Sequence, residues 1–170
     1  FPPHFFAALP ALSSLALQFN QLSGPIPAQI SLSANLSSLL LHDNRLSGTI
    51  PPELGRLDRL QVFRAGGNPS LWGPIPPEIS NCSSLTDIGI AFTAVSGSIP
   101  GELGLLPNLV SLRLFSTNIS GSIPPGLANC TRLLELFLFD NHLDGWLPPE
   151  LGRLTNLRFL YLWGNELSGP

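Results

Sequence analysis

Hydrophobic and polar positions recur along this chain with a period of 24 residues. In the clearest copy, residues 36–59, leucine occupies positions 1, 4, 6 and 11, asparagine position 9, glycine position 13, Ile-Pro positions 15 and 16, and leucine positions 19 and 22. The copies begin at Leu12, Leu36, Leu60, Leu85, Leu109, Leu133 and Leu157. Every step is 24 residues except the step of 25 between the third and fourth copies. Seven registered copies predict a protein built by stacking one structural unit.

An LxxLxLxxNxL core at this period is the signature of a leucine-rich repeat solenoid. We therefore predict an α/β horseshoe-type fold, with short parallel strands stacked on the concave face and short 3-10 or helical turns on the convex face. The whole chain, 1–170, is expected to form one segment. It divides into a partial repeat 1–11, full repeats starting at 12, 36, 60, 85, 109 and 133, and a partial repeat 157–170. Because both ends fall inside a repeat, we expect a piece of a longer chain.

Each repeat should contribute one strand around its LxL triplet, with the flanking residues pointing inward and the middle residue outward. The expected strands are 15–17, 39–41, 63–65, 88–90, 112–114, 136–138 and 160–162. The asparagines at position 9 should form a buried ladder, because an amide both donates to and accepts from the turn backbone. They are Asn20, Asn44, Asn68, Asn141 and Asn165, with Thr93 and Thr117 replacing them in two copies.

The second half of each repeat contains turn residues. Glycine at position 13 predicts a positive φ angle, and the following Ile-Pro favours an extended segment before a short helical turn near position 19. Four acidic residues at position 18 are expected to cap that turn and favour its dipole, rather than to act in catalysis. They are Glu53, Glu78, Glu102 and Glu150.

Composition excludes several functions. The chain has a net charge of −3, and its eight Lys and Arg residues are scattered, which argues against nucleic-acid binding. No apolar run has the length of a membrane span, so this segment is not expected to contact a membrane. His4, His42 and His142 lie far apart in the predicted column. We expect no catalytic site, no metal and no cofactor.

Two cysteines and four glycosylation sequons bear on the compartment. Cys82 and Cys130 both occupy position 22, two repeats or roughly 10 Å apart, which is too far for a disulfide. We predict two buried free thiols. The sequons lie at Asn35, Asn81, Asn118 and Asn129. Three of them fall late in their repeats, away from the strand face, and this favours a secreted or ectodomain setting.

Function should lie where the repeats differ, on the outward strand positions. Seven aromatic residues collect there toward the C-terminal end: Phe92, Phe115, Phe137, Phe139, Phe159, Tyr161 and Trp163. An exposed aromatic run indicates a binding surface. The alternative is that the rings cover each other or a neighbouring segment.

The third copy carries a candidate anion site. Arg64 points outward beside Gly66 and Gly67, and a guanidinium next to accessible backbone N–H groups suits a sulfate, phosphate or carboxylate. Alternatively, the glycines accommodate the 25-residue step. Arg113 lies about 10 Å along the face, where it is expected to pair with a second ligand carboxylate. We expect three acidic residues to discriminate against surplus negative charge on the ligand: Asp87, Glu135 and Asp140.

The (L/I)SGxIPxxLGxLxxL form of the repeats resembles the plant-specific leucine-rich repeat class over essentially all 170 residues. That resemblance implies a right-handed superhelix with a second small sheet. Residues 64–67, read as RAGG, resemble the RxGG motif of the root meristem growth factor receptors, which bind short secreted peptides carrying a sulfated tyrosine. The resemblance implies that Arg64, Gly66 and Gly67 receive the sulfotyrosine. An RxR pair, which that family uses for the peptide's C-terminal carboxylate, is absent from this sequence.

The resemblance implies an extracellular recognition module on the outer face of the plasma membrane, in the apoplast, as part of a single-pass receptor kinase. Its implied partners are a small secreted peptide and a co-receptor kinase ectodomain. We expect the peptide to lie on the outward strand face. The alternative is a secreted inhibitor of microbial polygalacturonase, which would present a more charged face to a folded enzyme.

Overall fold

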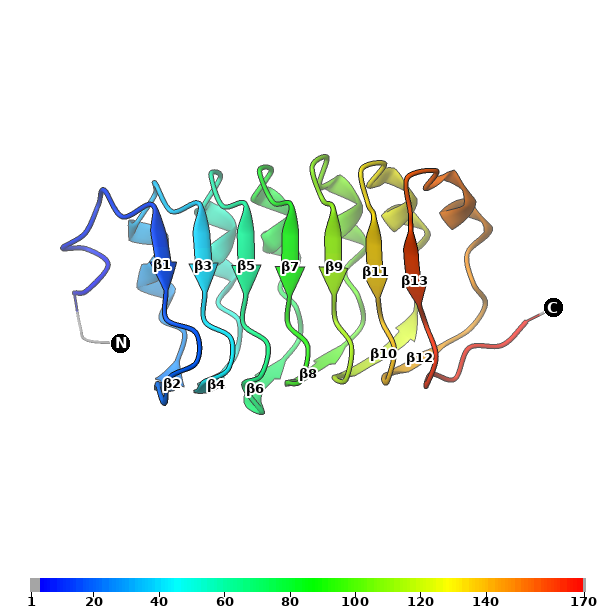
Figure 1. Ribbon diagram of the computed structural model, residues 1–170, viewed down its shortest axis with the longest axis horizontal. Coiled ribbons are helices and arrows are strands. Elements are labelled where there is room, and N and C mark those ends of the chain that lie inside the picture. Colours follow the sequence, from blue (N-terminus) through cyan, green and yellow to red (C-terminus); the bar gives the residue numbers. More distant parts are fainter. Residues whose placement is uncertain (1–3, 170) are drawn as a thin grey trace.

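The computed structural model describes residues 4–169, in which short strands and 3-10 turns alternate and form a stack of repeats (Figure 1). Residues 1–3 and 170, at the ends of the two predicted partial repeats, lie outside the described residues. The stack is an open solenoid, and this confirms the predicted horseshoe-type leucine-rich repeat fold.

The concave face is a seven-stranded sheet in the order β1-β3-β5-β7-β9-β11-β13. Its strands are β1 (Ser14–Ala16), β3 (Ser38–Leu40), β5 (Val62–Arg64), β7 (Asp87–Gly89), β9 (Ser111–Arg113), β11 (Glu135–Phe137) and β13 (Phe159–Tyr161). All neighbours are parallel and pair equivalent positions, as with Leu39 opposite Phe63. The sequence therefore sets the register through its period.

Each observed strand begins and ends one residue earlier than predicted. Position 3 already pairs with the preceding repeat, because the Ser38 N–H donates to the Ser13 carbonyl at 3.2 Å. The predicted last residue still forms a backbone bond, from the Leu41 N–H to the Arg64 carbonyl at 2.7 Å. The inward and outward alternation is confirmed, since Leu39 and Leu41 are fully buried and Leu40 is half-buried.

A second sheet lies along one side of the stack, in the order β12-β10-β8-β6-β4-β2. Its strands are β2 (Ser23–Pro25), β4 (Arg45–Gly48), β6 (Ser70–Gly73), β8 (Ala94–Gly97), β10 (Asn118–Ser122) and β12 (His142–Asp144). The 3-10 turns lie behind the concave sheet (Figure 1). They are η1 (Ala28–Leu32), η2 (Pro52–Arg56), η3 (Pro77–Asn81), η4 (Gly101–Leu105), η5 (Pro125–Asn129) and η6 (Pro149–Arg153). No helix in residues 4–169 has the length and apolar content needed to span a bilayer.

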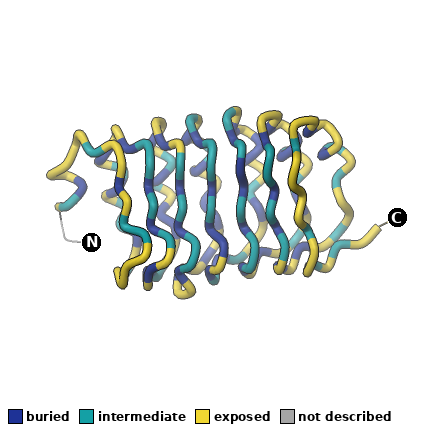
Figure 2. Tube along the Cα trace, in the orientation of Figure 1, coloured by how far each residue is buried: buried dark blue, intermediate teal, exposed yellow. Residues whose placement is uncertain are grey.

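The hydrophobic core is a continuous column between the concave sheet and the 3-10 turns, built from the repeated leucine and isoleucine positions. Dark, buried segments follow one another through every inner repeat, whereas the two ends of the stack are more exposed (Figure 2). Cys82 and Cys130 are buried free thiols within this column, as predicted. Burial in apolar surroundings raises the pKa of each thiol to about 11.

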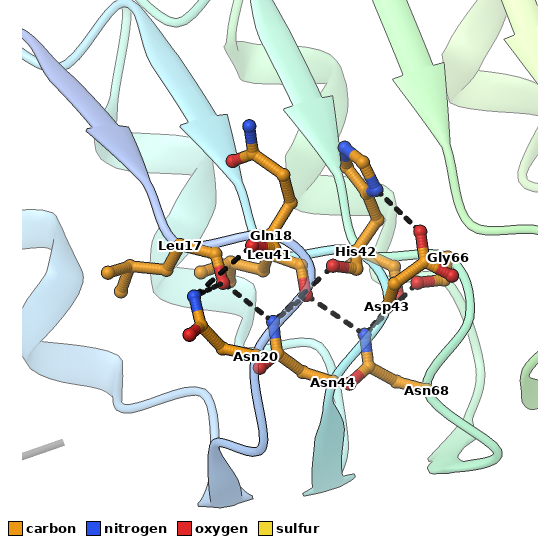
Figure 3. Close-up of polar contacts among 10 residues, drawn as sticks. Leu17, Gln18, Asn20, Leu41, His42, Asp43, Asn44, Gly66 and Asn68 are labelled. Atoms are coloured by element: carbon orange, nitrogen blue, oxygen red, sulfur yellow. Dashed lines mark hydrogen bonds and ion pairs between the residues drawn. The ribbon is translucent and has the colours of Figure 1, made fainter.

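The asparagine ladder is present (Figure 3), and its members inside the stack, Asn44, Asn68 and Asn141, are buried. The Asn68 amide donates to the Leu41 carbonyl at 3.1 Å and to the Ala65 carbonyl at 2.9 Å, and it accepts from the Leu46 N–H at 2.9 Å. Asn44, Asn141 and Asn165 join two repeats in the same way, whereas the Asn20 amide donates only to carbonyls of its own repeat. The prediction of burial is wrong for Asn20, which is exposed because no described repeat covers it on its outer side. Asn165, in the last repeat, is only half-buried.

The threonines of the ladder do part of the work of asparagine. The hydroxyls of Thr93 and Thr117 donate to the Ile90 and Leu114 carbonyls at 2.9 and 3.0 Å, within their own repeats. Both side chains are buried. In these two copies the hydroxyl therefore replaces the amide only partly.

The turn glycines take positive φ angles as predicted, for example +78° at Gly48. The capping role expected for the position-18 carboxylates is wrong. Glu53 lies inside the first turn of η2, the N-cap residue is Pro51, and no side chain caps the turn. Proline offers no side-chain acceptor, and the glutamates of η3, η4 and η6 stand in the same arrangement. Their carboxylates are left with only the interaction with the turn dipole.

Candidate functional site

The concave face carries an open hollow of about 290 Å³ over β5, β7 and β9. Its lining residues are His42, Asp43, Arg64, Gly66, Gly67, Gly89, Ala91, Phe92, Arg113 and Phe115. Six of the predicted ligand-binding residues therefore meet in one place. The other four lining residues were not predicted from the sequence: His42, Asp43, Gly89 and Ala91.

The strand pattern explains how two arginines come to share this hollow. Arg64 and Arg113 stand at position 5 of β5 and β9, and Gly89 stands at the same position of β7 between them. A Cβ on Gly89 would lie 3.4 Å from Cγ of Arg64. The missing side chain therefore leaves room for both guanidinium groups above β7. The sequence signal for this arrangement is a glycine at a position that holds large residues in the other repeats except the first, which has Ala16.

Asp87, which begins β7, is bound by both arginines. Its Oδ1 accepts from Nε of Arg64 at 3.0 Å, and its Oδ2 accepts from Nη2 of Arg64 at 2.8 Å and from Nη1 of Arg113 at 3.2 Å. The Asp87 side chain is only 13% exposed. Hydrogen bonding to Asp87 raises the pKa of Arg64, and this outweighs the opposing effect of burial.

The network continues across the sheet to β11. Nη2 of Arg113 donates to Oε2 of Glu135 at 2.5 Å, and the Ser111 hydroxyl donates to the same oxygen at 2.9 Å. The sequence did not indicate that these arginines and carboxylates, each predicted to act on the ligand, also bind each other. Asp87 and Glu135 are direct partners of the arginines, because position 3 of one strand lies beside position 5 of the next.

The glycine pair has a structural cause that the motif did not reveal. Position 8 follows the concave strand, and its backbone has a positive φ angle in all seven copies of the repeat. The angle is +63° at Gly67. The non-glycine residues that share this conformation are Phe19, Asp43, Phe92, Ser116 and Asp140. A Cβ on Gly67 would also lie 2.4 Å from Oδ1 of Asp43, whose Oδ2 binds Nδ1 of His42 at 2.8 Å (Figure 3).

The expectation of free backbone donors at both glycines is wrong at Gly67. Its N–H donates to the Ala91 carbonyl at 2.8 Å. Gly66 is also confined, since a Cβ there would lie 2.7 Å from the same carbonyl oxygen. These glycines allow close approach of neighbouring backbones, while the arginine side chains provide the donors that face the hollow.

An aromatic ladder, which we define as Phe92, Phe115, Phe139 and Trp163, leads from the hollow toward β13. Phe92 meets Phe115 edge to face, with ring centroids 5.2 Å apart. Phe139 is stacked on Phe115 at 4.4 Å and on Trp163 at 4.5 Å. The two flanking rings therefore cover both faces of Phe139, which can offer only its edge to a ligand.

A second stack lies beside the aromatic ladder. Phe137 and Tyr161 are parallel with centroids 4.8 Å apart, and Phe159 stands 6.5 Å from Phe137. The alternative interpretation, in which rings cover each other, is therefore correct for their faces. It does not account for the whole surface, because Phe92 and Trp163 are each 59% exposed.

The four sequon asparagines are all exposed. Asn81 and Asn129 end η3 and η5 on the convex side, whereas Asn118 begins β10 in the second sheet. Asn35 donates to the Pro10 carbonyl at 3.0 Å and accepts from Arg59 at 2.8 Å. Within residues 4–169, no group of three or more His, Cys, Asp and Glu side chains could hold a metal ion.

Repeat pattern and fold together define a leucine-rich repeat protein. The family profile described as Leucine Rich Repeat matches residues 35–57, 108–130 and 132–154. None of the curated proteins matches the sequence. Solved structures do match, and they place the chain more narrowly.

The structure is similar to that of the plant peptide hormone receptor RGFR1 in complex with RGF2, with 41% identity over 98% of this chain and 27% of that chain, and a TM-score of 0.96. It is also similar to the structure of the Arabidopsis receptor kinase HAESA in complex with the peptide hormone IDA and the co-receptor SERK1. The identity is 37% over 98% of this chain and 28% of that chain, and the TM-score is 0.93. The ectodomain of the receptor kinase SOBIR1 from Arabidopsis thaliana is 30% identical over 74% of this chain and 69% of that chain, with a TM-score of 0.66.

This chain belongs to the leucine-rich repeat ectodomains of plant receptor kinases. It spans little more than a quarter of the length of the RGFR1 and HAESA chains that it matches.

Proposed function

We propose that this chain is an extracellular recognition module that binds a short secreted peptide, in extended form, along its concave face. The observation that carries this proposal is the continuity of two different surfaces. A hollow with two guanidinium groups opens directly onto the aromatic ladder, because Phe92 and Phe115 belong to both. A linear ligand with one anionic end and an apolar remainder fits that arrangement.

The dimensions set the length of the ligand. Seven strands about 4.8 Å apart form a floor of roughly 30 Å, which an extended peptide of about nine or ten residues spans. Its anionic group docks at Arg64 and Arg113, and its apolar side chains lie over the aromatic ladder and the adjacent Phe137–Tyr161 stack. A sulfated tyrosine supplies both an anionic group and an aromatic body.

The relatives support the same class of partner. The solved RGFR1 complex contains RGF2, and the HAESA complex contains the peptide hormone IDA and the co-receptor SERK1. By that similarity, we assign this chain to the extracellular face of the plasma membrane as part of a single-pass receptor kinase, with a co-receptor ectodomain as its second partner.

Inhibition of a microbial polygalacturonase is the competing function. A folded enzyme requires a broad surface with exposed charges, whereas the arginines and acidic residues of this face are largely paired with each other. The large exposed side chains toward the C-terminal end of this face are aromatic, as with Phe92, Tyr161 and Trp163. Both observations favour a narrow, partly apolar ligand.

The test is to map binding on the isotope-labelled protein by NMR. The probe is a ten-residue peptide with one tyrosine sulfate near its N-terminus and an apolar remainder. We expect amide shifts at Gly66, Gly67 and Gly89 and along β9 to β13, with none in the second sheet. Shifts confined to the second sheet or to the 3-10 turns would overturn the proposal, and inhibition of a fungal polygalacturonase by the chain would favour the alternative.

A further inference from the structure

We propose that the hollow selects a singly charged anionic group over a doubly charged one, and that Asp43 and Asp87 are the residues that impose this selection. The inference rests on the proposed function, because it concerns the group that docks at Arg64 and Arg113. It assigns specificity to two carboxylates inside a site that otherwise resembles a general anion site.

The first argument is the charge balance. Arg64 and Arg113 bring two positive charges to the hollow, and Asp43 and Asp87 bring two negative charges. The remaining charged or titratable groups nearby are Glu135, which pairs with Arg113 from the far side, and His42, which binds Asp43. Leaving His42 aside, the two arginines and the three carboxylates sum to one negative charge, so the hollow holds no surplus positive charge before a ligand arrives.

The second argument is that hydrogen-bonding capacity survives this neutralisation. A guanidinium carries five N–H donors. Arg64 donates two of them to Asp87, and Arg113 donates one to Asp87 and one to Glu135. Three donors remain on each arginine. A ligand oxygen is therefore held by directed hydrogen bonds, while the net attraction for negative charge is small.

The lack of surplus positive charge and the free hydrogen-bond donors together predict different affinities for the common anionic groups. A sulfate ester or a carboxylate carries one negative charge, whereas a phosphate ester carries between about 1.5 and 2 at neutral pH. All three can accept from the free arginine donors. Only the phosphate ester brings additional charge close to Asp43 and Asp87, and like charges at this range repel. The site should therefore bind the sulfate ester more tightly.

Asp87 is fixed in position, so the ligand cannot relieve this repulsion by displacing it. Its carboxylate accepts three hydrogen bonds from two neighbouring strands. Asp43 is held by His42 on one side and by the close approach of Gly67 on the other. Asparagine at either position keeps the size of the side chain and one acceptor oxygen. In Asp87→Asn the amide nitrogen cannot accept the arginine bonds that one carboxylate oxygen now holds. This variant therefore also frees arginine donors for either ligand, and the ratio of the two affinities reports the charge.

The test uses two blocked amino acids, N-acetyl tyrosine-O-sulfate amide and its O-phosphate analogue, titrated against the full chain at pH 7.5. Binding is followed by NMR at the arginine Nε–H groups and the Gly66 amide. We expect the wild type to prefer the sulfate by about tenfold, the order of effect of one like charge in a partly solvated site. In Asp87→Asn the phosphate should gain about tenfold more affinity than the sulfate, and Asp43→Asn should act in the same direction.

Two controls isolate the charge effect. Asp58→Asn, on an exposed turn outside the hollow, should leave the preference unchanged. At pH 5 the phosphate ester falls toward a single charge, so the wild-type preference should shrink, and the sulfate compound at the same pH reports any contribution of His42.

An unchanged preference in both Asp87→Asn and Asp43→Asn would overturn the inference, as would a wild-type preference for phosphate. Those results would leave peptide binding intact. If neither compound bound the wild type, the proposed anion docking itself would be wrong, and the inference would fall with it.

Discussion

Oδ1 of Asp43 lies 2.4 Å from the place that a Cβ on Gly67 would occupy. The same relationship recurs four repeats later, where Oδ1 of Asp140 lies 2.6 Å from the corresponding place on Gly164. Both glycines have positive φ angles, +63° and +68°. An Asp–Gly pair across adjacent repeats is therefore a local solution for packing at position 8, and it explains Gly67 without a ligand.

We therefore predict that Gly67→Ala destabilises the fold. The new methyl group would force Asp43 to move and would hold alanine in a left-handed conformation, at a cost of about 1–2 kcal/mol in the free energy of unfolding. Gly152→Ala is the matched control, because nothing lies within 4 Å of the place that its Cβ would occupy and its φ is not positive. Urea denaturation of both variants measures the difference, and equal stabilities would contradict this explanation.

The asparagine ladder gives a second prediction. Asn68→Ala removes an amide with hydrogen bonds to Leu41, Ala65 and Leu46. The Leu41 carbonyl keeps its bond from the Asn44 amide, but the Ala65 carbonyl and the Leu46 N–H lose this buried side-chain partner. The expected loss is about 2–4 kcal/mol. Asn20→Ala changes the same repeat position at an exposed site, where water replaces the amide, and should cost less than about 1 kcal/mol. Thermal or urea unfolding distinguishes the two, and a similar loss in both would show that burial does not set the cost.

The buried thiols predict a loss of stability in alkali. Burial raises the pKa of Cys82 and Cys130 from 9.0 to about 11, so the folded state holds their protons more tightly than the unfolded state. Their contribution is fully present below pH 9 and is lost as the pH rises from 9 to about 11. The loss amounts to about 3 kcal/mol for each thiol. Stability measured at pH 8.5 and 10.5 should fall less in the Cys82→Ala, Cys130→Ala double variant; an identical fall would contradict the prediction.

The aromatic ladder predicts an effect on binding. Phe139→Ala removes the ring between Phe115 and Trp163 and opens a gap in the surface beneath the apolar part of the peptide. We expect the peptide affinity to fall about tenfold or more, with a change in Trp163 fluorescence. Trp72→Ala is the control, because Trp72 is 57% exposed but belongs to the second sheet. Calorimetry should show unchanged affinity for that variant, and a loss in both would argue against a concave site.

The sequence predicts the fold well because the same pattern of leucine, asparagine and glycine positions recurs in every repeat. In the inner repeats the residues of position 4 and position 6 are buried, and Cys82 and Cys130 are separate free thiols. These features depend on period and spacing, which the sequence displays directly. The burial predicted for Asn20 and the capping role predicted for the glutamates at position 18 were wrong. Burial depends on whether a neighbouring repeat covers the residue, and capping depends on the local geometry of the turn. The pattern of a single repeat shows neither.

The site is harder to predict because it depends on contacts between repeats. The sequence indicated Arg64 and Arg113, yet it placed Asp87 and Glu135 in a separate role. Their pairing requires position 3 of one strand to lie beside position 5 of its neighbours, and it is favoured at Gly89, where a Cβ would already contact Cγ of Arg64. The rings were predicted to face outward, but the sequence did not reveal that Phe139 is stacked on both faces. The direction of a side chain along the stack depends on the residues of the neighbouring repeats, which the sequence of one repeat does not show.

Titration calorimetry with a tyrosine-sulfated peptide and its unsulfated twin tests the central claim most directly. The measurement is made on the wild type, on Arg64→Ala and on Arg56→Ala, a control in η2 on the convex side. In Arg64→Ala, Asp87 keeps its bond to Arg113, so no buried charge is left without a partner. We predict that the sulfated peptide binds the wild type and Arg56→Ala at least about tenfold more tightly than its twin, the scale of one charge-assisted contact, and that Arg64→Ala abolishes the difference. Equal affinities of the two peptides for the wild type, or a sulfate preference that persists in Arg64→Ala, would contradict the account.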